Sequence, residues 1–312
     1  MVKLSRKIAI STGWDYIMIN NIDPFLKILH PEVQARLGKI RHVLFDFDGT
    51  LSVLREGWET VMVPVMIEAI CGQTPATAEI ELEVQEYVEQ STGILTILQM
   101  EWLVDAVRRH GLAGPPQSAG AYKAHYLERL MVGVRERILQ VETGACQADD
   151  RMLSGARDFL AGLQKRGALL YLISGTDHAD VQREAGVLGL AEYFAGRIYG
   201  ALDEREAHSK DRIVQRILDE YHLFGDELLV VGDGPVEIRA ARGRWAIALG
   251  VASNEVARSG WNGRKVARLS KAGADLLIPD FSQTEKLFSL LFSSSPKRRF
   301  AASPPPPARG RG

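Results

Sequence analysis

Two aspartates, Asp46 and Asp48, follow a short apolar and β-branched segment at residues 40–45. Such a segment, bounded by a glycine, predicts a buried strand of a parallel sheet. Open α/β sheets bind ligands just outside the carboxyl ends of their strands, so this strand would hold both carboxylates at the rim of a site. The alternative is a strand that ends in an acidic turn, because Asp, Gly and Thr are common turn residues. The Asp-x-Asp-Gly-Thr pattern at residues 46–50 favours the site.

Three further segments bring polar residues to the ends of predicted elements. Ser174 and Gly175 follow an apolar strand, where a hydroxyl and backbone N–H groups would face an anion at a helix start, although Ser-Gly-Thr is also a generic turn. Lys210 precedes a predicted helix, a place where a lysine is more often a surface residue. Asp233 follows a strand and a glycine, and Glu237 belongs to the Pro-led helix after it.

In this order, the four segments resemble the four motifs of the haloacid dehalogenase (HAD) superfamily. The resemblance covers roughly residues 40–290. The first motif contains a second aspartate, Asp48, and in this it is similar to the motif of the phosphotransferase branch rather than to that of the dehalogenases. The fourth segment departs from the commonest form, Gly-Asp-x-x-x-Asp, because Glu237 stands where an aspartate is often found. The resemblance implies an α/β fold, a doubly wound parallel sheet of the HAD Rossmannoid type, with an inserted all-α cap domain.

The same resemblance implies a magnesium site. Mg2+ would be bound by the carboxylate of Asp46, the main-chain carbonyl of Asp48 and the carboxylate of Asp233. The extra methylene of Glu237 leaves open whether this side chain binds Mg2+ directly or through water.

Catalytic and phosphate-binding roles follow from the resemblance as well. Asp46 would attack phosphorus and form an aspartyl phosphate, while Asp48 would protonate the leaving alkoxide and then deprotonate the attacking water. Ser174, Gly175 and Lys210 would bind the phosphoryl oxygens. The positive charge of Lys210 and Mg2+ would offset the repulsion between an anionic substrate and an anionic nucleophile.

The interpretation that fits best is a Mg2+-dependent phosphatase, similar to the phosphoglycolate phosphatase group, that acts on a small organic phosphomonoester. A mutase similar to β-phosphoglucomutase would use the same two aspartates, and no residue separates the two activities. A dehalogenase has no need for Asp48. A non-catalytic HAD-fold binding module would be expected to lack one of Asp46, Asp48, Lys210 or Asp233, all of which are present.

The elements that must position these residues divide the chain into four parts. We expect an N-terminal lead-in at residues 1–39, a catalytic core at 40–56 and 150–292, a helical cap at 57–149 and a disordered Pro/Arg-rich tail at 293–312. Strands and helices alternate in the core, which predicts a parallel sheet with helices on both faces. Apolar stripes with three- and four-residue steps predict about four helices in the cap.

The expected strands and lead-in complete this outline. The lead-in is expected to pack through one face of short helices that carries Phe25, Leu26, Leu29, Val33 and Leu37. After the first strand, further core strands are expected at residues 168–174, 197–199, 227–231, 245–249 and 275–278.

Charged residues near the predicted cap are candidates for substrate contacts. Arg55 and Glu56 lie a few residues after the aspartates and are expected either to contact the substrate or to form the hinge of the cap. Further positive charge from the cap is expected at Arg108, Arg109, Lys123 and His125, with a solvated helix face as the alternative for each.

Composition limits the remaining possibilities. The chain of 312 residues has a net charge of −1, from 38 Lys and Arg against 39 Asp and Glu, which gives no support for nucleic-acid or membrane binding. Cys71 and Cys146 are far apart and suggest neither a disulfide framework nor a zinc site. With no apolar run of about 18 residues and no signal peptide, a cytoplasmic location is expected. Nothing in the sequence predicts the oligomeric state.

Overall fold

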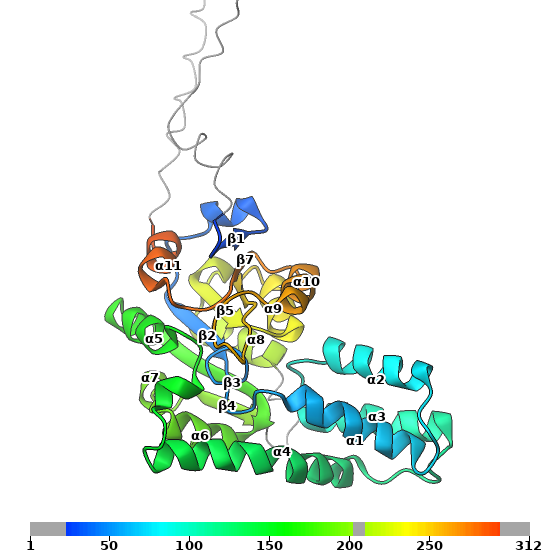
Figure 1. The fold of residues 1–312 in the computed structure, drawn as a ribbon. Helices are drawn as coiled ribbons and strands as arrows, with labels where there is room; N and C mark the ends of the chain where they lie inside the picture. The colour runs from blue at the N-terminus through cyan, green and yellow to red at the C-terminus, as the bar shows by residue number, and fades with distance from the viewer. Residues whose placement is uncertain (1–22, 202–209, 294–312) are drawn as a thin grey trace, which may run out of the picture.

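The core of the protein is a twisted sheet in which almost all strands are parallel. The computed structural model describes residues 23–201 and 210–293 (Figure 1). Its seven-stranded sheet has the order β1-β7-β6-β5-β2-β3-β4, and every pair of neighbours is parallel except β1 and β7. The strands are β1 (Lys27–Ile28), β2 (His42–Asp46), β3 (Leu169–Asp177), β4 (Ile198–Ala201), β5 (Leu228–Gly232), β6 (Ile247–Val251) and β7 (Leu276–Ile278).

Helices cover both faces of this sheet, as predicted for a doubly wound fold. All residues of β2 are buried, and successive side chains of a strand point to opposite faces. Val43 and Phe45 therefore join one core cluster and Leu44 joins the other. The first cluster includes residues of α5 (Ala156–Lys165), α6 (His178–Val187), α7 (Ala191–Phe194) and α11 (Thr284–Leu291), and the second includes residues of α8 (Lys210–Glu220), α9 (Pro235–Arg242) and α10 (Gly263–Ala272).

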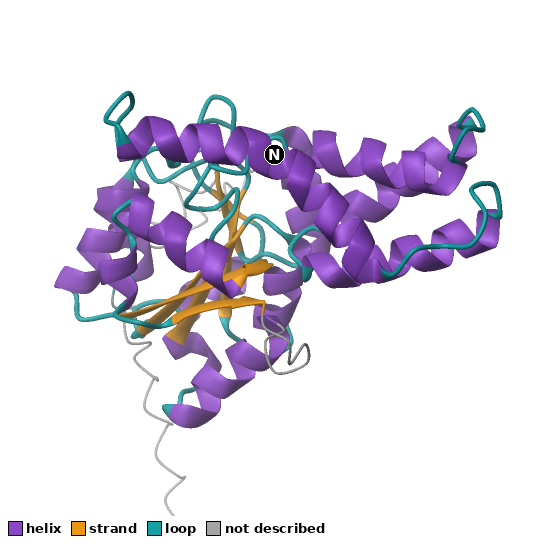
Figure 2. Cartoon of the chain, turned by 90° about the horizontal axis from the view of Figure 1, so that it is seen from below, coloured by secondary structure: helices purple, strands orange, loops and turns teal. Residues whose placement is uncertain are grey.

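The first four of the five α-helices between β2 and β3 form an insertion. They are α1 (Trp58–Cys71), α2 (Ala78–Gln90), α3 (Thr96–His110) and α4 (Ala119–Glu142). Figures 1 and 2 show that this helical insertion extends to one side of the sheet, with α4 running back toward the core. The fold class is thus confirmed as an α/β core with an inserted helical unit, while the domain boundaries at residues 57 and 149 stay a prediction.

The register of the sheet brings the functional segments together. Asp46 pairs with Ile173 of β3, and Phe45 pairs with Val231 of β5. Because parallel strands end at the same edge of a sheet, Ser174 and Asp233 follow close to Asp46. No helix in the described part of the chain is long and apolar enough to cross a lipid bilayer.

The lead-in differs from its prediction. Residues 27–28 form β1, which pairs antiparallel with the edge strand β7, and a 3-10 helix spans Pro31–Ala35. Phe25, Val33 and Leu37 are buried as expected, although no regular helical face carries them. This two-residue strand forms through backbone pairing with β7. Backbone pairing leaves no periodic pattern of side chains, so the sequence does not reveal the strand. Residues 1–22 lie outside the described residues, as does the predicted tail apart from Ser293.

Ser174 lies in a strand as predicted, but the helix expected directly after it begins later. Strand β3 continues to Asp177, so Ser174 and Gly175 belong to the strand, and α6 begins only at His178. The extension is stabilised by pairing of Asp177 with Ala201 of β4, across an irregularity after Ile173. The small residues at this point therefore lie in an irregular stretch of the strand rather than in the first turn of a helix.

Candidate active site

Three acidic side chains meet at the carboxyl edge of the sheet. Asp46 ends β2, Asp233 follows β5 and Glu237 lies in the first turn of α9. All three are buried, and one carboxylate oxygen of each lies within 4.8 Å of those of the other two. The structure thus brings together three of the predicted metal ligands.

Lys210 is the partner of two of these acids. Its Nζ lies 2.6 Å from Oδ1 of Asp46 and 2.8 Å from Oε2 of Glu237. Thr50 Oγ1 donates to the other oxygen of Asp46 over 3.1 Å. Burial disfavours the ammonium, but Asp46 and Glu237 outweigh this effect and raise the pKa of Lys210, so it stays charged. The predicted phosphate-binding lysine is therefore present at the site and contacts the predicted nucleophile.

Glu237, which stands where the commonest form of the fourth motif has an aspartate, uses its longer side chain for a second contact. Oε1 of Glu237 accepts a hydrogen bond from the backbone N–H of Gly234 over 2.6 Å and so caps the first turn of α9. The side chain folds back over Gly232, where a Cβ atom would lie 2.3 Å from Oε1. The longer side chain caps its own helix and still brings Oε2 to Lys210.

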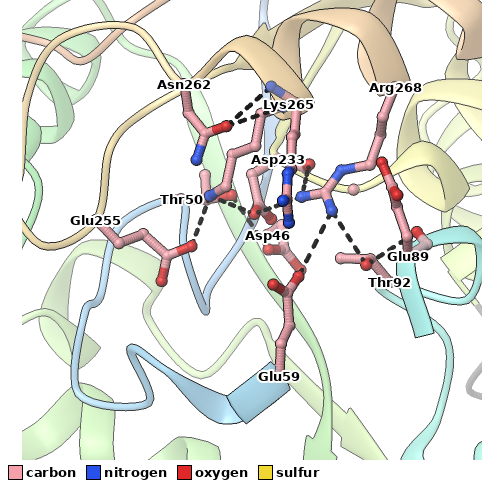
Figure 3. A network of polar contacts seen from close by, with 12 residues as sticks. Asp46, Thr50, Glu59, Glu89, Thr92, Asp233, Glu255, Asn262, Lys265 and Arg268 are labelled. Carbon is pink, nitrogen blue, oxygen red and sulfur yellow. Dashed lines mark hydrogen bonds and ion pairs between the residues drawn. The ribbon is translucent and has the colours of Figure 1, made fainter. Parts of the chain in front are cut away.

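Asp233 has cationic partners that the sequence does not reveal. Oδ2 of Asp233 lies 2.7 Å from Nζ of Lys265, and Arg268 donates to the main-chain oxygen of Asp233 over 3.0 Å (Figure 3). Lys265 also donates to Glu255 over 2.6 Å. Lys265 and Arg268 are three residues apart and share one face of α10, but this spacing is common on solvated helices. No pattern distinguishes them in the sequence.

The pKa values of the two aspartates move in opposite directions. Burial raises the pKa of Asp46 well above its usual range, and the nearby charges of Glu237 and Asp233 add to this effect. Burial acts in the same direction on Asp233, but Lys265 and Arg268 outweigh it and lower the pKa of Asp233. The surroundings therefore disfavour the ionised form of Asp46 and favour that of Asp233.

Asp48 is held in place by two hydroxyl groups. Ser174 Oγ donates to Oδ2 of Asp48 over 3.0 Å, and Thr176 Oγ1 donates to the same oxygen over 3.2 Å. Oδ1 is buried without a hydrogen-bond partner among the described residues and lies 3.9 Å from Nε of Arg55. Ser174, predicted to bind a phosphoryl oxygen, thus contacts the predicted acid–base residue, and one oxygen of Asp48 remains available.

Arg55 and Glu56, the candidates for a substrate contact or for the hinge, have different environments. Arg55 is buried and donates to Glu184, with Nη2 2.6 Å from Oε1, and it lies 3.4 Å from Asp180. Glu56 instead pairs with Arg137 of α4 over 3.3 Å. Arg55 lines the site cavity and Glu56 does not.

The free energy of unfolding should depend on pH because Glu184 is buried against Arg55. Burial raises the pKa of Glu184 from 4.5 to about 7, although Arg55 opposes the shift. Between these values the folded chain keeps a proton that the unfolded chain has released, so the free energy of unfolding falls as pH rises. Glu184→Gln removes this ionisation, so wild type should lose more stability than the variant between about pH 5 and pH 8 in denaturant titrations. Parallel pH profiles would contradict the assignment.

The helical insertion forms the other wall of the site. A cavity of about 580 Å³, part of it open to solvent, lies between the acids and this insertion. The insertion contributes residues from α1, α3 and α4 and the α2–α3 loop, residues 91–95. Arg268 links the two walls, because it donates to Thr92 Oγ1 over 3.2 Å as well as to Asp233 (Figure 3).

Close packing between Gly175 and this loop gives a second prediction. A Cβ atom at Gly175 would lie 2.4 Å from the backbone oxygen of Ile94. Gly175→Ala should therefore displace the loop and lower any activity of the site by about 10- to 100-fold in kcat/KM, with little change in Tm. Gly186→Ala, on the exposed side of α6 with nothing within 4 Å, is the matched control. Equal activity of both variants would show that the loop position does not matter.

The candidate cations of the insertion lie elsewhere. Arg108 pairs with Asp105, Arg109 with Glu83 and Lys123 with Asp177. His125 is exposed. None of these four side chains lines the cavity.

Comparison with solved structures agrees with the fold of this chain. Solved structures with the same fold include a predicted phosphatase from Clostridium acetobutylicum (TM-score 0.53, 16% identity, covering 80% of this chain and 99% of the other). They also include a predicted phosphoglycolate phosphatase from Haemophilus somnus 129pt (TM-score 0.53, 16% identity, 80% and 98% covered) and a β-phosphoglucomutase from Clostridium difficile (TM-score 0.53, 14% identity, 81% and 97% covered). No curated protein sequence matches the chain significantly.

The sequence model of one protein family matches most of the chain. The match covers residues 40–243, which include all four predicted motifs and the helical insertion. The chain therefore belongs to the haloacid dehalogenase-like hydrolase family.

Proposed function

We propose that this hydrolase is a Mg2+-dependent phosphatase that acts on a small organic phosphomonoester through an aspartyl phosphate. The observation that carries the proposal is the position of Asp46 and Asp48 on one cavity, with Lys210 bonded to Asp46. An attacking carboxylate, an acid–base group and a fixed ammonium are the groups that phosphoryl transfer needs. Relatives of the same fold that are described as phosphatases support the proposal.

The acidic cluster fits a small hard cation. The cluster consists of the carboxylates of Asp46, Asp233 and Glu237, and Mg2+ prefers oxygen ligands of this kind. We propose that Asp46 and Asp233 hold the ion together with the main-chain carbonyl of Asp48, and that Glu237 lies next to it. When bound, Mg2+ would neutralise charge on the phosphoryl group and favour the ionised form of Asp46.

Each protein residue then has a defined task. A carboxylate oxygen of Asp46 attacks phosphorus while the bond to the ester oxygen breaks, and Asp48 gives its proton to that oxygen. Asp48 next takes a proton from a water molecule, which attacks phosphorus and releases inorganic phosphate from Asp46. Ser174 and Thr176 keep the carboxyl group of Asp48 oriented for both transfers.

The alternative activity is a sugar phosphate mutase, in which the aspartyl phosphate passes its phosphoryl group to a sugar rather than to water. Incubation with Mg2+ and a sugar monophosphate distinguishes the two. Release of inorganic phosphate in proportion to substrate consumed supports hydrolysis, whereas an isomeric sugar phosphate without release supports the mutase. A chain that turns over neither this ester nor p-nitrophenyl phosphate would instead be a binding module.

We also propose a cytoplasmic location, with which the free thiols of Cys71 and Cys146 are compatible.

A further inference from the structure

The wall of the cavity opposite the acids is uncharged. Helices α1 and α4 contribute Trp58, Met62 and Leu130, and the α2–α3 loop contributes Ile94. Helices α3 and α4 also contribute three neutral polar side chains, those of Thr96, Gln99 and Tyr126. The part of a substrate that leaves with the ester oxygen would contact this wall, because Asp46 and Asp48 lie on the other side.

The cations near the site do not change this neutrality. Among the described residues, Arg55 is the one cation that lines the cavity, and it faces Glu184, Asp180 and Asp48. Lys210, Lys265 and Arg268 each bond to an acid of the site and do not line the cavity. A carboxylate or second phosphate on the leaving group would therefore meet no uncompensated positive charge from the part of the chain that the structure describes.

We infer that the substrate is the phosphomonoester of an uncharged alcohol with an apolar face and a few hydroxyl groups. The inference rests on the proposed phosphatase function and deepens it. Burying an unpaired anion costs far more than burying a hydroxyl that can bond to Thr96, Gln99 or Tyr126. Phosphoglycolate and sugar bisphosphates, whose leaving groups are anionic, are poor substrates on this basis.

A matched pair of esters tests the inference. Phosphoglycolate and 2-hydroxyethyl phosphate differ mainly in the exchange of a carboxylate for a hydroxymethyl group. With Mg2+, kcat/KM for phosphate release should be at least about tenfold higher for 2-hydroxyethyl phosphate. Calorimetric titration of the same two esters should show the same preference in binding. Equal or tighter binding of phosphoglycolate would overturn the inference, whether or not either ester is hydrolysed.

The two proposals fail in different ways. Absence of turnover of both esters and of p-nitrophenyl phosphate would remove the phosphatase function, while the binding titration would still decide the charge of the preferred ligand. Turnover with a preference for phosphoglycolate would keep the phosphatase and reject the neutral leaving group.

A lysine introduced into the cavity wall tests whether this wall sets the preference between the two esters. Thr96→Lys places an ammonium on the neutral wall and should raise the ratio of kcat/KM for phosphoglycolate to that for 2-hydroxyethyl phosphate by about tenfold. Leu98→Lys adds the same charge to the same helix at an exposed position that does not line the cavity, and should leave the ratio unchanged. An equal shift in both variants would show that overall charge, rather than the cavity wall, sets the preference.

Discussion

Asp46→Asn should lower kcat for the hydrolysis of p-nitrophenyl phosphate by about 10⁴-fold or more, because the amide that replaces the carboxylate is not a nucleophile. The two side chains have almost the same shape, and the carbonyl oxygen of the new amide can still accept a hydrogen bond from Thr50 or Lys210. Release of p-nitrophenol with Mg2+, compared with the wild type under the same conditions, measures the effect.

Two controls separate chemistry from folding in this variant. Thermal unfolding should show a folded Asp46→Asn chain, since the substitution removes a buried carboxylate whose pKa is raised by burial and by Glu237 and Asp233. Asp105→Asn, which removes an exposed carboxylate on α3, should keep wild-type activity. Activity of Asp46→Asn equal to that of the wild type would reject the nucleophile assignment.

The parts of the site that follow strands can be predicted from the sequence. Asp46 and Asp233 lie where a buried apolar segment stops, and the alternation of strands and helices brings these ends to one edge. Lys210 follows from its order in the chain, and the structure places it against Asp46. The two aspartates are thus marked by the strands at whose ends they lie, whereas Lys210 is marked only by its position between the second and fourth motifs.

The residues that neutralise the site cannot be predicted in this way. Lys265 and Arg268 lie on a helix well after the last motif, and their contact with Asp233 depends on the angle at which α10 packs. Similarly, Glu184 looks like one more charged residue of α6, yet it is buried against Arg55. Such long-range pairs leave no local periodicity. The lack of free positive charge among the described residues that line the cavity is therefore visible only in the structure.

The second large effect is expected at Lys210. Lys210→Met keeps most of the length of the side chain but removes the ammonium that bonds to Asp46 and Glu237, so two buried acids lose their shared partner. Breaking a buried ion pair in this way costs about 3–5 kcal/mol of unfolding free energy. Denaturant titration in the presence of a chelator measures the loss, and phosphate release should fall as well because the phosphoryl oxygens lose a cation.

Two comparisons show whether the loss comes from unpaired charge. Lys39→Met breaks the exposed pair with Asp226, of similar length at 2.6 Å, and should cost at most about 1 kcal/mol because solvent screens such pairs. The double variant Lys210→Met with Glu237→Gln removes one of the two unpaired acids and should recover part of the lost stability, since the glutamine side-chain oxygen can still cap α9 at Gly234. If the double variant is less stable than Lys210→Met by the full effect of Glu237→Gln alone, the two residues are not coupled. The lysine would then stabilise the fold through packing of its alkyl chain rather than through the acids around it.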